Sequence, residues 1–171
     1  GKIAYTTNGR LPKNVVLKKG TIAIADGLFQ GSDLIESVTI PGTIKVINDN
    51  AFKDCDNLKT VTIGSGTKTI GASAFEGCDN LTNVTIGSGT TEIGRWAFGN
   101  CTNLTSITIS DNVTYIGEAA FYNCNSLTSV TIPDSVTSIG YSAFGSCSSL
   151  MGIYSKFASS DNRCLIIDGV L

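Results

Sequence analysis

The chain has 171 residues, of which 42% are hydrophobic and 15% are charged, and its formal net charge is −2. This length suits one domain with a continuous core, and the near-neutral charge argues against a nucleic-acid partner, which requires a basic surface. No stretch approaches the roughly 18 consecutive apolar residues of a membrane span, so no membrane insertion is expected. The lack of histidine excludes imidazole-dependent catalysis and His-ligated metal sites.

The first thirteen residues precede the regular part of the sequence. They contain Asn8-Gly9, a typical hairpin turn, and we expect residues 1–13 to form an amino-terminal cap over the end of the core. The chain begins with Gly1 and has no recognisable leader peptide, which says nothing about secretion.

A repeat of 23 residues organises residues 14–155. Equivalent positions recur without an insertion, which is typical of solenoids whose units stack and share a core. One column consists of phenylalanines, namely Phe29, Phe52, Phe75, Phe98, Phe121 and Phe144. A second column consists of cysteines, namely Cys55, Cys78, Cys101, Cys124 and Cys147. The period therefore predicts about six stacked units with a continuous phenylalanine core.

Each unit contains Leu-x-x-Val-x-Ile, whose period-two alternation and β-branched residues predict a strand with one buried face. A turn rich in Gly, Ser, Asp or Pro follows, then a short segment ending in Ile-Gly, and then x-x-Ala-Phe-x-x-Cys. In residues 72–78 the three-residue spacing of Phe75 and Cys78 predicts a short helical turn with both side chains on one face. Because this segment is too short to be helical alone, its structure depends on packing against neighbouring units.

The position before each predicted helical turn is restricted to small or turn-forming residues. They are Asn48, Gly71, Gly94, Gly117 and Gly140. Gly and Asn tolerate positive φ, so we expect a left-handed backbone conformation at this column. Gly94→Val is therefore predicted to destabilise the fold.

The repeat pattern ends after Tyr154, and residues 156–171 are expected to form an irregular carboxy-terminal segment. This segment ends in the apolar run from Leu165 to Leu171. Because an apolar end is a poor cap, we expect the natural chain to continue beyond Leu171.

The repeat is similar to a known family. Leu104-x-x-Ile107-x-Ile109 matches the first part of the general leucine-rich repeat motif, whereas the N/C position of that motif has no counterpart. The longer pattern Ile-Gly-x-x-Ala-Phe-x-x-Cys-x-x-Leu-x-x-Val-x-Ile resembles the BspA-like leucine-rich repeat family of bacterial cell-surface proteins, over about residues 14–155. The run from Leu165 to Leu171 also resembles segments that interrupt such arrays.

This resemblance implies an α/β leucine-rich-repeat solenoid, a horseshoe with a parallel sheet on the concave face and short helical turns. It also implies a secreted or cell-surface location, adhesion to a host or bacterial surface protein or glycan, and no shared catalytic residues. The alternative fold is a right-handed parallel β-helix, which predicts extended structure at Ala-Phe-x-x-Cys.

The cysteine column does not predict a metal site, because parallel side chains on successive units do not converge on a tetrahedral ion and no Cys-x-x-Cys pair exists. Disulfides along the column have the wrong geometry for the same reason. We expect buried free thiols that pack as small apolar groups. Cys164 lies outside the column and either pairs with Cys147 or stays free. No cofactor is expected.

Side chains that alternate with the buried strand positions carry mostly hydroxyl groups. They are Ser37, Thr39, Thr60, Thr62, Asn83, Thr85, Ser106, Thr108, Ser129 and Thr131. We expect them on the concave face and predict a binding surface at Thr39, Thr62, Thr85, Thr108, Thr131, Ser106 and Ser129. An uncharged hydroxyl surface suits a broad contact with a protein or glycan. The alternative is that Thr is simply favoured at exposed strand positions.

A second candidate surface is aromatic. Trp96, Tyr122 and Tyr141 occupy the predicted helical turns of successive units, and such residues are enriched in binding hot spots. The alternative is that these rings are partly buried against adjacent turns.

Three functions remain open. The first is a non-catalytic extracellular binding or adhesion module that presents the Ser/Thr-rich face. The second is a polysaccharide-acting enzyme on a β-helix, which requires a cleft of paired carboxylates, although no pattern places two carboxylates together. The third is a structural spacer domain.

Overall fold

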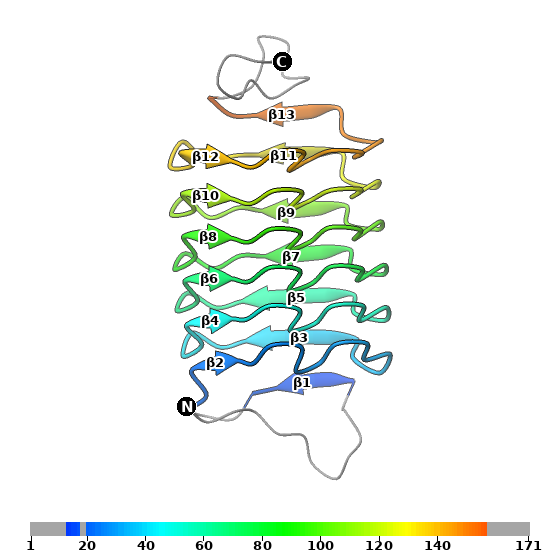
Figure 1. The fold of residues 1–171 in the computed structure, drawn as a ribbon, viewed down its shortest axis with the longest axis vertical. Helices are drawn as coiled ribbons and strands as arrows, with labels where there is room; N and C mark the ends of the chain where they lie inside the picture. The colour runs from blue at the N-terminus through cyan, green and yellow to red at the C-terminus, as the bar shows by residue number, and fades with distance from the viewer. Residues whose placement is uncertain (1–12, 18–19, 157–171) are drawn as a thin grey trace.

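The structure is a computed structural model that describes residues 13–17 and 20–156 (Figure 1). The predicted cap over residues 1–13 lies, apart from Lys13, outside the described residues, and so do residues 157–171 with Cys164. The strands are β1 (Asn14–Val16), β2 (Ala23–Ile24), β3 (Ser37–Ile40), β4 (Val46–Ile47), β5 (Thr60–Ile63), β6 (Thr69–Ile70), β7 (Asn83–Thr85), β8 (Glu92–Ile93), β9 (Ser106–Thr108), β10 (Tyr115–Ile116), β11 (Ser129–Thr131), β12 (Ser138–Ile139) and β13 (Gly152–Tyr154).

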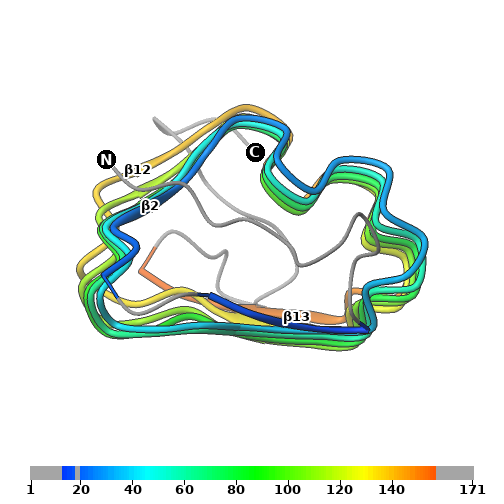
Figure 2. The same ribbon diagram turned by 90° about the horizontal axis from the view of Figure 1, so that it is seen from below.

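These strands form the two opposite walls of a solenoid. Strands β1, β3, β5, β7 and β9 make one parallel sheet, and β2, β4, β6, β8, β10 and β12 make a second parallel sheet. Each register joins residues 23 apart, as in Val38↔Val61 and Ile47↔Ile70. Seen along the stack, successive turns superpose around a shared interior (Figure 2). The predicted repeat, its strands and its solenoid fold are therefore confirmed.

The phenylalanine column forms the centre of the core. The rings of Phe52, Phe75, Phe98 and Phe121 have no exposed surface. Neighbouring rings stack with centroids 4.9–5.4 Å apart along the whole column. This spacing is close to the roughly 4.8 Å between paired strands, so the turns diverge little on the phenylalanine side. The stack is accordingly only slightly bent, as Figure 1 shows.

The predicted helical turns were wrong. The segment around Phe75 is a pair of tight turns in which Ser73 (φ 53°) and Gly77 (φ 70°) are left-handed. The Phe75 amide donates to the Ala97 carbonyl of the following unit at 2.8 Å, and Phe98 donates to Ala120 in the same way. Because these amides bond to the next unit instead of to residue i−4, no helix forms. The segment is not a strand either, so the extended coil of the β-helix alternative is also absent from this corner.

The glycine column is not left-handed, so the predicted conformational reason for it was wrong. Gly71, Gly94, Gly117 and Gly140 do not have positive φ, and the left-handed residue lies two positions later, at Ser73 in the third unit. Glycine is needed because adjacent turns approach closely: a Cβ on Gly94 would lie 2.7 Å from the Gly71 carbonyl carbon and 2.8 Å from the Ile70 oxygen. Backbone contacts therefore restrict the four glycine positions, whereas Asn48 at the start of the column has a side chain that donates to the Ile24 carbonyl at 2.7 Å.

Candidate functional site

The hydroxyl wall is the outward face of β3, β5, β7, β9 and β11. Its strands alternate as predicted: Val61 and Ile63 are buried, whereas Thr60 and Thr62 are exposed. One outward column runs Thr39, Thr62, Thr85, Thr108 and Thr131, all of them exposed. The predicted serines Ser106 and Ser129 are exposed in the adjacent column. The structure thus places all seven predicted wall residues on one exposed face.

The hydroxyls of this threonine column differ from those of several other threonines, which donate to the preceding unit. Examples are the bond from Thr90 to the Thr67 carbonyl at 3.2 Å and that from Thr105 to the Thr82 carbonyl at 3.0 Å. Within the described part of the chain, the hydroxyls of Thr39, Thr62, Thr85, Thr108 and Thr131 have no protein partner. They are therefore available to another molecule, whereas the hydroxyls of Thr90 and Thr105 are already used within the fold.

The wall opens between β9 and β11. Strands β7 and β9 are paired in register, but in the described structure β11 pairs with β13 and forms no ladder with β9. A hollow of about 410 Å³ lies at this opening. We call it the notch, and its polar lining includes Ser106, Thr108, Asp111, Ser129 and Thr131. Four of the seven predicted wall residues therefore line one concavity.

Pro133 lies at the opening. The residue after the Val-x-Ile or Ile-x-Ile segment of each unit is Pro41, Gly64, Gly87, Ser110 or Pro133. The Gly64 amide donates to the Ile40 carbonyl of the preceding unit at 2.8 Å, and a Cβ on Gly87 would lie 2.5 Å from the Ile63 oxygen. Pro133 has no amide hydrogen and adds a ring where glycine packs closely. Pro133 therefore cannot make this bond; Pro41 cannot make it either, yet β1 and β3 remain paired, so proline contributes to the opening without being sufficient for it.

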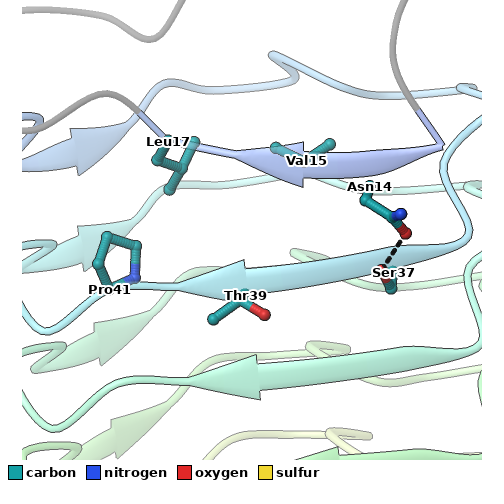
Figure 3. A pocket seen from close by; sticks show the side chains of 6 residues that line it. All are labelled: Asn14, Val15, Leu17, Ser37, Thr39 and Pro41. Carbon is teal, nitrogen blue, oxygen red and sulfur yellow. Dashed lines mark hydrogen bonds between the residues drawn. The ribbon is translucent and has the colours of Figure 1, made fainter.

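A second hollow lies at the other proline of this column (Figure 3). It has a volume of about 310 Å³ and lies between β1 and β3, with Val15, Leu17 and Pro41 in its lining. At its edge the Ser37 hydroxyl donates to the Asn14 side-chain oxygen at 2.6 Å. Residues 18–19, which directly follow Leu17, are outside the described residues.

Tyr154 is a candidate that reasoning from the sequence missed. It lies in β13 in register with Thr131, so it continues the exposed threonine column, and 51% of its surface is exposed. Its ring lies over Gly152, whose added Cβ would be 3.0 Å from the Tyr154 hydroxyl. The signal was present in the sequence, because Tyr154 follows Thr131 by one repeat of 23 residues.

The predicted aromatic surface is only partly assembled. Trp96 and Tyr122 are half-buried and in contact, with centroids 5.2 Å apart at an angle of 52°. The Trp96 ring lies so close to Gly99 that an added Cβ would be 2.5 Å from it. Tyr141 is 83% exposed and makes no ring contact with any described residue. Partial burial against adjacent turns therefore accounts for Trp96 and Tyr122, and Tyr141 stands apart.

The cysteine column is part of the core. Cys55, Cys78, Cys101 and Cys124 are buried free thiols, and Cys147 is a half-buried one. Each donates to a phenylalanine carbonyl of the preceding unit, as from Cys101 to Phe75 at 3.2 Å. Burial raises the pKa of the Cys55 thiol to about 11, and it raises the pKa of Cys78 well above its ordinary value. The thiolate, which is the reactive form, is therefore disfavoured.

Thiol chemistry should report on this burial. Iodoacetamide at pH 8 is expected to leave Cys55 and Cys78 unmodified in the folded protein and to modify Cys147 first, with peptide mass spectrometry as the readout. The same burial predicts a pH dependence of stability. Because the pKa of Cys55 is higher in the folded than in the unfolded state, the neutral thiol contributes fully to the free energy of unfolding below the unfolded pKa of about 8.5. This contribution is lost as the pH rises to about 11. Urea unfolding at several pH values should show this loss of stability, and the loss should be smaller in Cys55→Ala. In the iodoacetamide experiment, modification of Cys78 as fast as Cys147 would contradict the burial.

The described carboxylates do not assemble a catalytic pair. Apart from Glu36 and Glu76, which are half-buried, all of them are exposed. Glu76 pairs with Lys53 at 2.7 Å, and Glu36 pairs with Lys13 at 2.6 Å. A hydrogen bond from Lys13, together with its charge, lowers the pKa of Glu36. A general acid needs a raised pKa, so Glu36 does not have the environment of one.

Comparisons with known proteins agree with this architecture. The family described as BspA type leucine rich repeat region matches residues 22–151 in six copies. A leucine rich repeat protein of T. pallidum is similar, with 32% identity, a TM-score of 0.68, and coverage of 69% of this chain and 57% of that one. A leucine rich cell surface protein of Faecalibacterium prausnitzii has 31% identity and a TM-score of 0.68, with coverage of 91% and 49%. A leucine-rich repeat protein of Eubacterium ventriosum has 27% identity and a TM-score of 0.66, with coverage of 80% and 37%.

The chain therefore spans 37% to 57% of the length of these three solved relatives. The comparison with curated proteins gave no match. Among the described residues, no helix has the length and the apolar character that crossing a membrane requires.

Proposed function

The chain belongs to the BspA-type leucine-rich repeat family, and from this premise we propose that it is a non-catalytic binding module of a bacterial cell-surface protein. One of its solved relatives is described as a leucine rich cell surface protein. A repeat scaffold suits this role because each added unit extends a contact surface without requiring a new core. The partner is a host or bacterial surface protein or glycan.

The observation that carries this proposal is the set of unpartnered hydroxyls on the hydroxyl wall. Thr62 and Thr85 are register partners on neighbouring strands, so their side chains form a regular row. Each hydroxyl both donates and accepts a hydrogen bond, and the row has no like charge that would repel a partner. The threonines of this wall thus offer a long polar surface, whereas threonines such as Thr90 are used within the fold.

Charge on the wall should abolish partner binding. We expect the double variant Thr62→Lys and Thr85→Lys to lose binding to an array of immobilised extracellular-matrix proteins and glycans, because the ammonium groups cover the hydroxyl row. The matched control is Thr69→Lys with Ser138→Lys, which makes the same kind of change on the opposite wall, in β6 and β12. Circular dichroism and thermal melting should show that both variants stay folded.

The outcomes separate the alternatives. Loss of binding in the wall variant with retention in the control supports the hydroxyl wall. Equal binding by the wild type and both variants would show that the binding surface lies elsewhere, for example on the flank of Trp96 and Tyr141. No binding to any component of the array would favour the spacer role.

A further inference from the structure

The notch between β9 and β11 interrupts an otherwise continuous sheet. In the described structure, a parallel ladder joins β7 to β9 and another joins β11 to β13, but none joins β9 to β11. The facing edges of Ser106–Thr108 and Ser129–Thr131 therefore lack the ladder partners that a continuous sheet provides. Backbone N–H and C=O groups without such partners bind water or a ligand, so the notch offers donors and acceptors from both strands.

The width of the notch limits what can enter it. Cα atoms of β9 and β11 still approach within 8 Å of each other. An inserted peptide strand needs two sheet spacings, about 9.6 Å in all, so the notch is too narrow for an added strand. Its volume of about 410 Å³ falls in the range of small-ligand sites, about 300–1,000 Å³. The occupant is therefore a compact polar group that lies against the outward side chains of the notch, and not a peptide strand inserted between the two backbones.

The lining selects the chemistry of that group. Ser106, Thr108, Ser129 and Thr131 contribute hydroxyls that both donate and accept. Asp111 contributes a carboxylate, and the residues that line the notch include no Lys or Arg, so an anionic ligand is disfavoured. The half-buried Ile107 adds an apolar area. Many hydroxyls around a small apolar area match a neutral sugar ring, which has hydroxyls at its rim and C–H groups on its faces.

Tyr154 lies one strand beyond the notch. Its register partner is Thr131, which lines the notch, and about half of its surface is exposed. An exposed tyrosine combines an apolar ring with a polar tip, which suits stacking against the C–H face of a sugar. We propose that the notch binds one neutral sugar residue of a glycan and that the adjoining residue stacks on Tyr154. This inference rests on the proposed binding function and assigns it a ligand class and a position on the wall.

Pro133→Gly tests the notch without removing any of its polar side chains. The substitution restores the glycine that Gly64 and Gly87 supply in other units, together with an amide that can donate to the Ile109 carbonyl, as Gly64 donates to Ile40. We expect the strands to close and sugar binding to fall by at least about tenfold. Pro41→Gly is the matched control, because it makes the same change in the same column at the other hollow, and its binding should be unchanged.

The probes are neutral oligosaccharides of glucose, mannose, galactose and N-acetylglucosamine, added at millimolar concentration to the ¹⁵N-labelled chain. Binding to the wild type should shift the amide resonances of Ser106, Thr108 and Thr131. Hydrogen exchange at the amide that Pro133→Gly introduces shows whether the ladder has closed. If it has not closed, the double variant Thr108→Val and Thr131→Val removes the two hydroxyls while keeping the backbone, and Tyr154→Ala removes the ring.

The results distinguish this inference from the proposed function. The sugar site is supported if the sugars shift the resonances of the notch residues and if sugar affinity is lost in the closed Pro133→Gly variant or the double valine variant, and in Tyr154→Ala. The sugar site is overturned if the closed Pro133→Gly variant, the double valine variant or Tyr154→Ala retains wild-type affinity. It is also overturned if no sugar of the panel binds. If the Lys-substituted wall variant still loses a protein partner in that case, the binding function stands and only the sugar site fails.

Discussion

Replacing Phe98 by alanine should cost about 3–5 kcal/mol in the free energy of unfolding, the usual range for removing a buried aromatic side chain. Phe98 has no exposed surface, and its ring stacks between Phe75 at 5.2 Å and Phe121 at 5.4 Å. Adjacent units are held by hydrogen bonds on both walls and at the corners, so the backbone cannot easily collapse into the cavity. Urea unfolding followed by circular dichroism measures the loss.

Phe144→Ala is the matched control for this prediction. Phe144 is 9% exposed, and among the described residues it stacks on one neighbour only, Phe121 at 5.1 Å. Its loss should therefore cost clearly less than the loss of Phe98. Equal costs at the two positions would show that the phenylalanine column does not act as a continuous core.

Gly94→Val should destabilise the fold by about 3 kcal/mol, at the upper end of the cost of overpacking. A Cβ at this position would lie within 2.7–2.8 Å of two backbone atoms of the preceding unit. Backbone cannot rotate away as a flexible side chain can, so the turns must separate and weaken the Gly94–Ile70 hydrogen bond of 2.8 Å. Thermal and urea unfolding of the variant provide the measurement.

Two further substitutions identify the cause. Gly94→Ala should be destabilising as well, because the clash with the backbone of the preceding unit begins at the Cβ atom. Gly42→Ala should have little effect, since its added Cβ would come no closer than 3.7 Å to any atom of another residue. A Gly94→Ala variant as stable as the wild type would refute the steric explanation.

Much of the fold could be predicted from residue spacing. The long strands, the buried Phe and Cys columns and the exposed hydroxyl row were predicted correctly, since each depends only on side-chain alternation and on contacts between residues 23 apart. The conformation at Ala-Phe-x-x-Cys was not. The three-residue spacing of Phe75 and Cys78 fits a helical turn, but the Phe75 amide is bonded to the next unit. A local pattern cannot show that an amide bonds to another turn of the chain.

The candidate site was predictable to the same extent. All seven wall residues lie on the expected face, because alternation determines which side of a strand a residue faces. The notch was not predicted: proline was considered only as one of the turn residues that follow the strand, and the effect of Pro133 depends on how closely Gly64 and Gly87 let their units approach. The association of Trp96 with Tyr122, and the separation of Tyr141 from any ring contact, likewise depend on how adjacent turns lie against each other.

The sequence by itself determined the period, the register and the identity of the core columns, because a residue in a stacked repeat has its own counterparts as neighbours. Only the tertiary structure decided the corner conformation, the opening of the wall at Pro133 and which hydroxyls remain unpartnered. Those features arise from backbone atoms of different units meeting within a few ångströms. The approach of two turns depends on both of them and on the units that hold them, so no single repeat specifies it.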